Sequence, residues 1–253
     1  MSTSLAFAYY FNVILGSRLI FTFKDEPLST KQTAVMLAVQ AVGLLALEVG
    51  LPLIVLAATL GVIGAALAVV ENRVGQVKQT RLASLVAYFV ALNVFFSPSV
   101  RLDFSPRLDS FIQSIGSVLS LLARGGSTDW VRFHVTLAGA LLTTNEVNTL
   151  VRYLFQVFNL EPKMEAQSGG DKVELDEEEY KAGRVIGILE RVLVYHLVLN
   201  DQYSAIGLVL AAKSFTRFKD LEKRQRAEYV LIGTLASTLL AMLTAAATEA
   251  LLP

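Results

Sequence analysis

Long uninterrupted apolar runs occupy most of the first hundred positions of the chain. Residues 5–23 form a run of about the length that a helix needs to cross roughly 30 Å of hydrocarbon. The next run, residues 33–70, is nearly twice as long as one crossing at about 1.5 Å per residue. Gly50 and Pro52 predict a break inside it, because proline removes a backbone donor and clashes with the preceding turn. The pattern therefore predicts four membrane spans, at about residues 5–23, 33–48, 51–70 and 82–96.

The N-terminal segment has no basic region and no small-residue cleavage site before its apolar run. We expect it to be retained as the first helix. Arg18 lies near the end of this helix, and its long side chain is expected to snorkel to the headgroups.

A different pattern begins at Ser105. Ser105 and Pro106 are typical of a helix start, and residues 105–123 then separate an apolar face from a face rich in serine and glutamine. This pattern predicts an amphipathic helix that lies in the membrane interface or lines a wet cavity. A further helix is predicted from a cap at Asp129 to about residue 158. Polar residues interrupt its middle at positions 143–148, so it cannot face lipid on all sides if it crosses the membrane.

The acidic stretch at residues 161–181 is the best linker in the chain. Apolar runs at 185–199 and 203–212 then flank a polar break at 200–202, and a basic segment leads into a last span at 229–252. The predicted organisation is a four-span bundle at 1–98, an amphipathic and a partly polar helix at 99–158, an acidic linker at 159–184, and C-terminal membrane helices at 185–253 with a basic cytoplasmic segment at 213–227.

Composition supports lipid as the solvent, since 54% of the residues are hydrophobic and only 17% are charged. We therefore predict an all-α polytopic membrane protein with about five to seven crossings plus one amphipathic interfacial helix. The net charge of zero gives no reason to expect binding of duplex DNA. With no cysteine and only two histidines, we expect neither a metal site nor a cofactor.

Three basic loops, at residues 24–31, 73–81 and 213–226, favour the cytoplasmic side of the membrane. Placing all three inside makes the second and third spans a hairpin. It also requires an odd number of crossings between residues 105 and 212. One true crossing together with one interfacial or re-entrant element, broken at residues 200–202, satisfies this requirement.

Four sequence blocks near the C-terminus follow one another at residues 187–191, 211–214, 217–218 and 228–235. On these blocks, residues 183–237 resemble the C-terminal part of an uncharacterised family of bacterial integral membrane proteins, a domain of unknown function. The resemblance implies a multi-pass protein of the bacterial plasma membrane. It carries over no activity.

The basic segment permits two interpretations. It is either an anchor that meets anionic lipid headgroups, or a site for a nucleotide-like or other phosphate-bearing ligand in which Phe215 and Phe218 stack on bases. The acidic run at 176–179 is either a solvated part of the linker or a partner for this segment. The candidate binding residues are Lys213, Arg217, Lys219, Lys223, Arg224 and Arg226.

Several polar residues lie within or beside the apolar runs. A charge in the bilayer is costly, so it usually pairs, faces the bundle interior or lines a water path. These residues either sit at helix ends among headgroups or form a functional polar pathway, and His196 is better explained as an interhelical hydrogen-bonding residue than as a metal ligand. The candidates are Glu48, Asn145, Glu146, Glu190, Arg191, His196 and Asp201.

Small residues recur at four-residue steps in two spans, a spacing that lets helix backbones approach closely in lipid. Either intramolecular packing or a subunit interface satisfies this pattern. The residues are Ala57, Gly61 and Ala65 in the third span, and Gly233, Ser237, Ala241 and Ala245 in the last.

No motif for a catalytic triad, a metalloprotease or a phosphate-binding loop is found in the sequence. The first hypothesis is therefore a homo-oligomeric protein of the lipid bilayer that conducts ions or perturbs the membrane. In this hypothesis residues 217–226 form a regulatory surface, and the protein serves as a ligand-gated effector in bacterial signalling or antiviral defence. The second hypothesis is a structural anchor or assembly subunit for a partner protein, and the third is a membrane enzyme or transporter.

Overall fold

The computed structural model describes residues 3–106, 129–158, 177–216 and 224–252, and within these ranges the regular elements are helices. The predicted all-α class is confirmed. Within the described ranges, three helical segments are long and apolar enough to cross a membrane, namely Ser4–Phe21, Leu51–Val74 and Val230–Leu251. The chain divides into two compact units: unit 1 comprises residues 1–141 with 251–253, and unit 2 comprises residues 142–250. The predicted amphipathic helix beyond Pro106 and most of the acidic linker lie outside the described residues.

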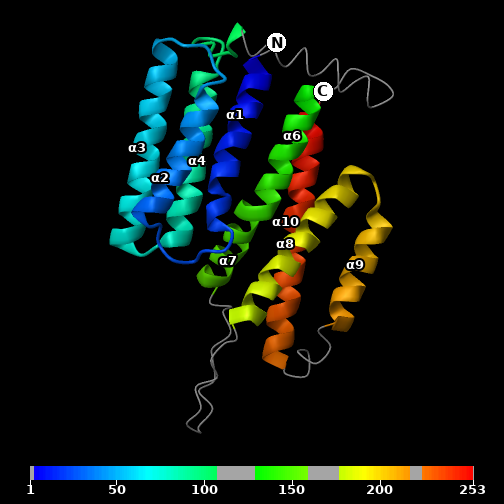
Figure 1. Ribbon diagram of the computed structural model, residues 1–253. Helices are drawn as coiled ribbons and strands as arrows, with labels where there is room; N and C mark the ends of the chain where they lie inside the picture. Colours follow the sequence, from blue (N-terminus) through cyan, green and yellow to red (C-terminus); the bar gives the residue numbers. More distant parts are fainter. Residues whose placement is uncertain (1–2, 107–128, 159–176, 217–223, 253) are drawn as a thin grey trace. The chain divides into compact units, whose positions relative to one another are not determined.

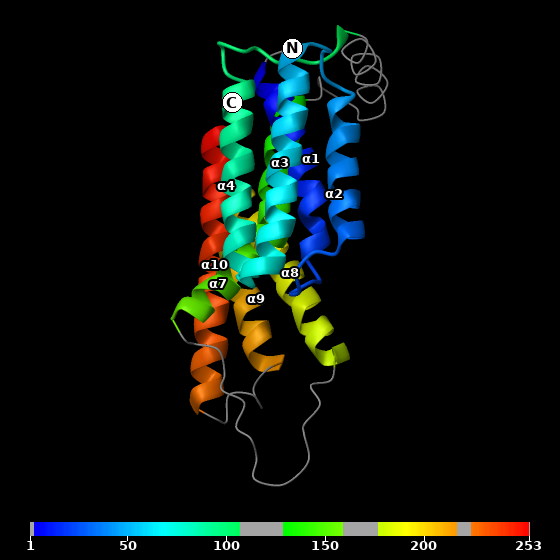
Figure 2. The same ribbon diagram turned by 90° about the vertical axis from the view of Figure 1, so that its left-hand side faces the viewer.

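Unit 1 is a helical bundle built around its first helix. Its members are α1 (Thr3–Arg18), which continues into a 3-10 turn (Leu19–Phe21), α2 (Thr30–Leu44), α3 (Leu51–Val74), α4 (Val77–Phe95) and α6 (Trp130–Leu141). Figures 1 and 2 show α1 to α4 running alongside one another. Helix α1 contacts α2, α4 and α6, whereas α3 packs on α2 and α4. The candidate span in α1 is accordingly 61% buried, against 22% for the span in α3.

The ends of these helices follow local sequence rules. Helix α2 begins three residues before its predicted start, because Ser29 and Gln32 form a reciprocal capping box. The predicted break at Gly50 and Pro52 is confirmed: Gly50 is the N-cap of α3, and the proline lies in its first turn, where no backbone donor is needed. Gly75 ends α3 with a φ of 71°, a conformation that side chains with a Cβ rarely adopt.

The connection between α2 and α3 is held by a second segment of unit 1. Leu47 and Phe104 form an isolated antiparallel bridge. The backbone N–H of Glu48 donates to the carbonyl of Asp103 at 2.9 Å, and the N–H of Ser105 donates to the carbonyl of Ala46 at the same distance. The side chain of Glu48 itself is exposed.

The polarity of unit 1 is inverted relative to a water-soluble bundle. Buried positions include Asn12, Ser17, Gln40, Glu71 and Ser84. The exposed faces of α2, α3 and α4 are lined by large apolar residues, which suits contact with lipid tails. These exposed residues include Val35, Val39, Val42, Ile54, Val55, Val62, Val69, Val86, Phe89, Val90 and Val94.

Unit 2 contains a five-residue π-helix (Leu142–Glu146) and the helices α7 (Val147–Val157), α8 (Glu177–Leu199), α9 (Tyr203–Thr216) and α10 (Arg224–Leu251). The predicted polar break at residues 200–202 is confirmed as the turn between α8 and α9, where Asp201 has a φ of 56°. Helix α8 begins eight residues before the predicted apolar run, inside the acidic stretch. Acidic residues are favourable in the first turn of a helix, so the run at 176–179 belongs partly to this helix rather than wholly to a linker.

The small-residue face of α10 packs inside unit 2. Ala241 and Ala245 are fully buried, and a Cβ added to Gly233 would lie 3.0 Å from a ring carbon of Phe155. On α3, by contrast, Ala57 and Ala65 are exposed. The two small-residue patterns therefore have different structural settings, one within the unit and one on its surface.

Candidate functional site

Arg191 is the centre of a buried polar cluster in unit 2. It lies on α8, and only 5% of its surface is exposed. Its Nε donates to the carbonyl of Thr143 at 3.2 Å, and its two Nη atoms donate to the Oγ of Ser237 at 3.5 Å and to the Oδ1 of Asn148 at 3.3 Å. The guanidinium thus joins α8 to α10, to α7 and to the π-helix.

Arg191 contacts the π-helix through the carbonyl of Thr143. In a π-turn the hydrogen bonds run from residue i to i+5, so the ordinary helical ladder is interrupted, and such turns are frequent at functional sites. Thr143, Asn145 and Glu146 in this segment are all buried. The Nδ2 of Asn145 donates to the Oε1 of Glu146 at 2.9 Å. The polar interruption noted in the sequence is therefore an inward-facing polar segment.

A second charged contact lies next to the guanidinium. The Nζ of Lys213, on α9, donates to the Oε2 of Glu190, the residue before Arg191. A cavity of about 10 Å³ opens between α8, α9 and α10, and its polar lining is Glu190, Arg191, Lys213, Ser237 and Thr238. This volume is close to the smallest that holds one water molecule.

The depth of this cluster along the candidate span can be estimated from the position of Ser237 on α10. Ser237 lies seven residues after Val230, where the candidate span of α10 begins. At about 1.5 Å per residue, the Arg191 contact lies about 10 Å inside that span.

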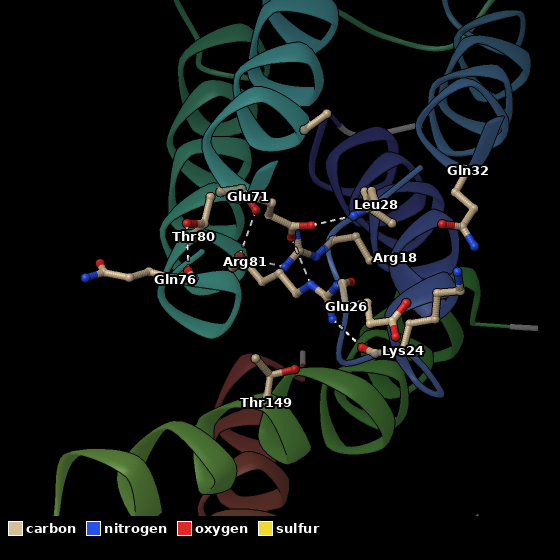
Figure 3. Close-up of polar contacts among 12 residues, drawn as sticks. Arg18, Lys24, Glu26, Leu28, Gln32, Glu71, Gln76, Thr80, Arg81 and Thr149 are labelled. Atoms are coloured by element: carbon tan, nitrogen blue, oxygen red, sulfur yellow. Dashed lines mark hydrogen bonds and ion pairs between the residues drawn. The ribbon is translucent and has the colours of Figure 1, made fainter. Parts of the chain in front are cut away.

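Unit 1 contains an independent buried ion pair at the end where α3 and α4 meet the connection between α1 and α2 (Figure 3). The Nε of Arg81 donates to the Oε1 of Glu71 at 2.9 Å, and the other carboxylate oxygen of Glu71 accepts from the N–H of Leu28 at 2.9 Å. The Nη atoms of Arg81 donate to the carbonyls of Lys24 at 2.6 Å and Glu26 at 2.9 Å. The pair therefore fixes the connection against the α3–α4 hairpin.

Arg18 extends this network and corrects a prediction. It was expected to snorkel to the headgroups, but its side chain is completely buried. Its Nη atoms donate to the Oγ of Ser84 and the carbonyl of Arg81, both at 2.8 Å, and its guanidinium lies 5.0 Å from the ring centroid of Phe21. The snorkelling prediction was wrong because these inward acceptors satisfy the charge inside the bundle.

Further polar contacts tie α1 to its neighbours. The hydroxyl of Tyr10 donates to the carbonyl of Gln40 at 2.9 Å, and the Nε2 of Gln40 donates to the Oγ of Ser17 at 3.0 Å. On the side of α6, the Nδ2 of Asn12 donates to the carbonyl of His134 at 2.9 Å. These contacts hold the bundle together through the interior of α1.

Four of the seven predicted intramembrane polar residues lie in unit 2 on elements that contact each other: Glu190 and Arg191 line the cavity from α8, and Asn145 and Glu146 are buried on the π-helix, which packs on α8. Glu48, His196 and Asp201 have exposed side chains and take no part in this cluster. Of the six candidate binding residues, Lys213 pairs with Glu190. Arg217, Lys219 and Lys223 lie outside the described residues, as do the side chains of Arg224 and Arg226.

Sequence reasoning missed Glu71 and Arg81, which it placed in a charged loop. A usable indication was present at Gly75, whose position in a polar stretch predicts a tight helical hairpin. Opposite charges on either side of such a turn face each other when the two helices pack.

No family model, no curated protein and no solved structure matches this chain.

Proposed function

We propose that the chain is an integral membrane protein that assembles as a homo-oligomer and conducts ions, with the Arg191 cluster as part of its polar path. The observation that carries the proposal is a charged group buried about 10 Å inside a candidate span, with polar groups from three other segments directed at it. Ionisable residues at such depth commonly mark ion pathways and proton relays.

The inverted polarity of unit 1 supports membrane embedding. With α1, α3 and α10 as crossings, further helices bring the proposed total to five to seven, and the interfacial helix expected from the sequence at residues 105–123 falls largely outside the described residues. The basic connections on either side of α2 and α3 favour a cytoplasmic location for that end of unit 1. The bacterial plasma membrane remains the proposed location.

The outward small-residue face of α3 supports assembly into a homo-oligomer. Ala57 and Ala65 are exposed, and a Cβ added to Gly61 would meet no atom within 4 Å. Small residues at this spacing allow two helices to approach closely in lipid, where no hydrophobic force drives association.

The direct test measures assembly and conduction on one sample. The purified protein is sized in detergent by light scattering corrected for bound detergent, and the same fraction is then recorded in planar bilayers. We expect a discrete homo-oligomer that carries ion current, and we expect Arg191→Gln to reduce that current. The matched control Arg132→Gln, at an exposed arginine of α6, should leave it unchanged.

A silent monomer would contradict this proposal and favour the anchor hypothesis, which predicts co-purification of a soluble partner. Gating by a nucleotide-like ligand is a separate part of the proposal. If such a ligand gates the protein through the basic segment, charge reversal at Arg217, Arg224 and Arg226 should abolish the response to it. An unchanged response would contradict a regulatory role of the basic segment.

A further inference from the structure

The hydrogen bonds of Arg191 all go to neutral oxygens, and the carboxylate of Glu190, its neighbour in the chain, interacts with it electrostatically. A guanidinium has five N–H donors, and three of them are used by a carbonyl, a hydroxyl and an amide oxygen at 3.2 to 3.5 Å. Charge-assisted hydrogen bonds to an anion are typically shorter, at about 2.7–2.9 Å. Two of the five donors therefore remain for a group that the described residues do not supply.

The neighbouring carboxylate, Glu190, balances only part of the local positive charge. Glu190 directs its Oε2 to Lys213, so its charge is already shared with another cation. Glu146, the acidic residue of the π-helix, accepts from Asn145. The lining of the cavity between α8, α9 and α10 contains two cationic groups, Arg191 and Lys213, and one carboxylate, which gives a net charge of +1.

The shape and chemistry of the cavity limit what it holds. Its volume of about 10 Å³ suits a single atom or one water molecule rather than a nucleotide or a headgroup. Guanidinium, ammonium and the hydroxyls of Ser237 and Thr238 are donors, while Val194, Val209 and Leu210 form apolar walls. A sodium or potassium ion would meet a positive field, whereas a halide would meet hydrogen-bond donors.

We propose that this cavity binds a small monoatomic anion of the chloride class, which completes the coordination of Arg191. The anion offsets a buried charge that is otherwise expensive to hold away from water. The inference deepens the proposed conduction and rests on it for its biological role, since it names the anion as the conducted species. Binding of the anion to the cavity is tested by an experiment that does not depend on ion conduction.

The binding test is the thermal stability of the purified full-length protein in detergent, in sodium chloride, sodium bromide and sodium gluconate at equal ionic strength. We expect chloride and bromide to raise Tm in a saturable way that gluconate does not reproduce, because a ligand that binds only the folded state stabilises it. The effect should be absent in Arg191→Gln and retained in Arg132→Gln. Equal Tm in all three salts overturns the inference and means that another group of the chain meets the charge.

A second, milder variant tests the same inference if Arg191→Gln does not fold. Ser237→Ala removes one hydroxyl donor from the cavity, so the half-saturating chloride concentration should rise about three- to tenfold. An unchanged half-saturation overturns the inference.

Reversal potentials in a potassium chloride gradient separate the two proposals. A current that follows the chloride gradient supports both. A cation-selective current without halide stabilisation overturns the anion site and leaves conduction standing, whereas halide stabilisation without current keeps the site and removes the proposed function.

Discussion

The ion pair between Glu71 and Arg81 gives the sharpest stability prediction for this protein. Glu71 is completely buried and Arg81 is 4% exposed, so neither charge is well screened by water. Glu71→Gln keeps the shape of the side chain, and the amide oxygen still accepts from the N–H of Leu28. It removes the negative charge opposite Arg81 and leaves a guanidinium buried without its carboxylate.

The expected cost follows from that uncompensated charge. Removing one partner of a buried pair typically costs about 3–5 kcal/mol, whereas surface substitutions stay within about 0.5 kcal/mol. Glu48→Gln is the matched control, because Glu48 is exposed in the same unit. In an Arg81→Gln background the same Glu71→Gln change should cost less, by a coupling energy of about 0.5–3 kcal/mol.

The assay uses the single tryptophan of the chain. Trp130 lies on α6 in unit 1, with its ring 6.1 Å from that of Phe133. Its fluorescence during titration with SDS in mixed micelles therefore reports the unfolding of unit 1. A free energy of unfolding for Glu71→Gln within about 0.5 kcal/mol of the Glu48→Gln value would refute the reasoning, because the pair would then be as weak as a surface contact.

Two further predictions concern packing and a buried hydroxyl. A Cβ added to Gly43 would lie 2.5 Å from the Cγ1 of Val13, a stiff β-branched side chain, so Gly43→Ala should lower the unfolding free energy by about 1–3 kcal/mol. Gly16→Ala on α1 meets no atom within 4 Å and should raise it by about 0.5–1 kcal/mol in the same titration; a loss at both positions would contradict the packing of α1 on α2. In unit 2 the hydroxyl of Tyr195 donates to Thr248 at 3.3 Å, so Tyr195→Phe should cost about 0.5–1.5 kcal/mol by circular dichroism of the same micelles, and no change would mean that this bond is not formed.

Helix positions in this chain were largely predictable because they depend on local sequence. The apolar runs form helices, and the break at Gly50 and Pro52 and the turn at residues 200–202 appear as predicted. Of the four spans predicted before residue 98, those in α1 and α3 are long and apolar enough to cross a membrane. The errors at helix starts also have local causes. The capping box at Ser29 and Gln32 and the acidic first turn of α8 extend these helices beyond their apolar runs.

The partners of the buried charges were not predictable, because they depend on how distant segments pack. Arg18 and Arg81 are 63 positions apart in the sequence, so a preference for snorkelling could not reveal their contact. Glu190 and Arg191 were identified as polar residues in an apolar run. The role of Lys213 as the partner of Glu190 depends on the turn between α8 and α9, and the contact of Arg191 with the π-helix depends on the packing of α8.

The central claim is that the apolar surface faces lipid while the polar interior around Arg191 is reached by water. The chain has no cysteine, so single cysteines can be introduced without a background reaction. In proteoliposomes we would treat Ser237→Cys, at the cavity, and Leu239→Cys, whose leucine is 57% exposed on α10, with silver ions in nitrate buffer, because a monoatomic thiol reagent fits a cavity of this size. The account predicts that Ser237→Cys reacts and that Leu239→Cys does not. Rapid reaction of Leu239→Cys with no reaction of Ser237→Cys would place the apolar face in water and contradict it.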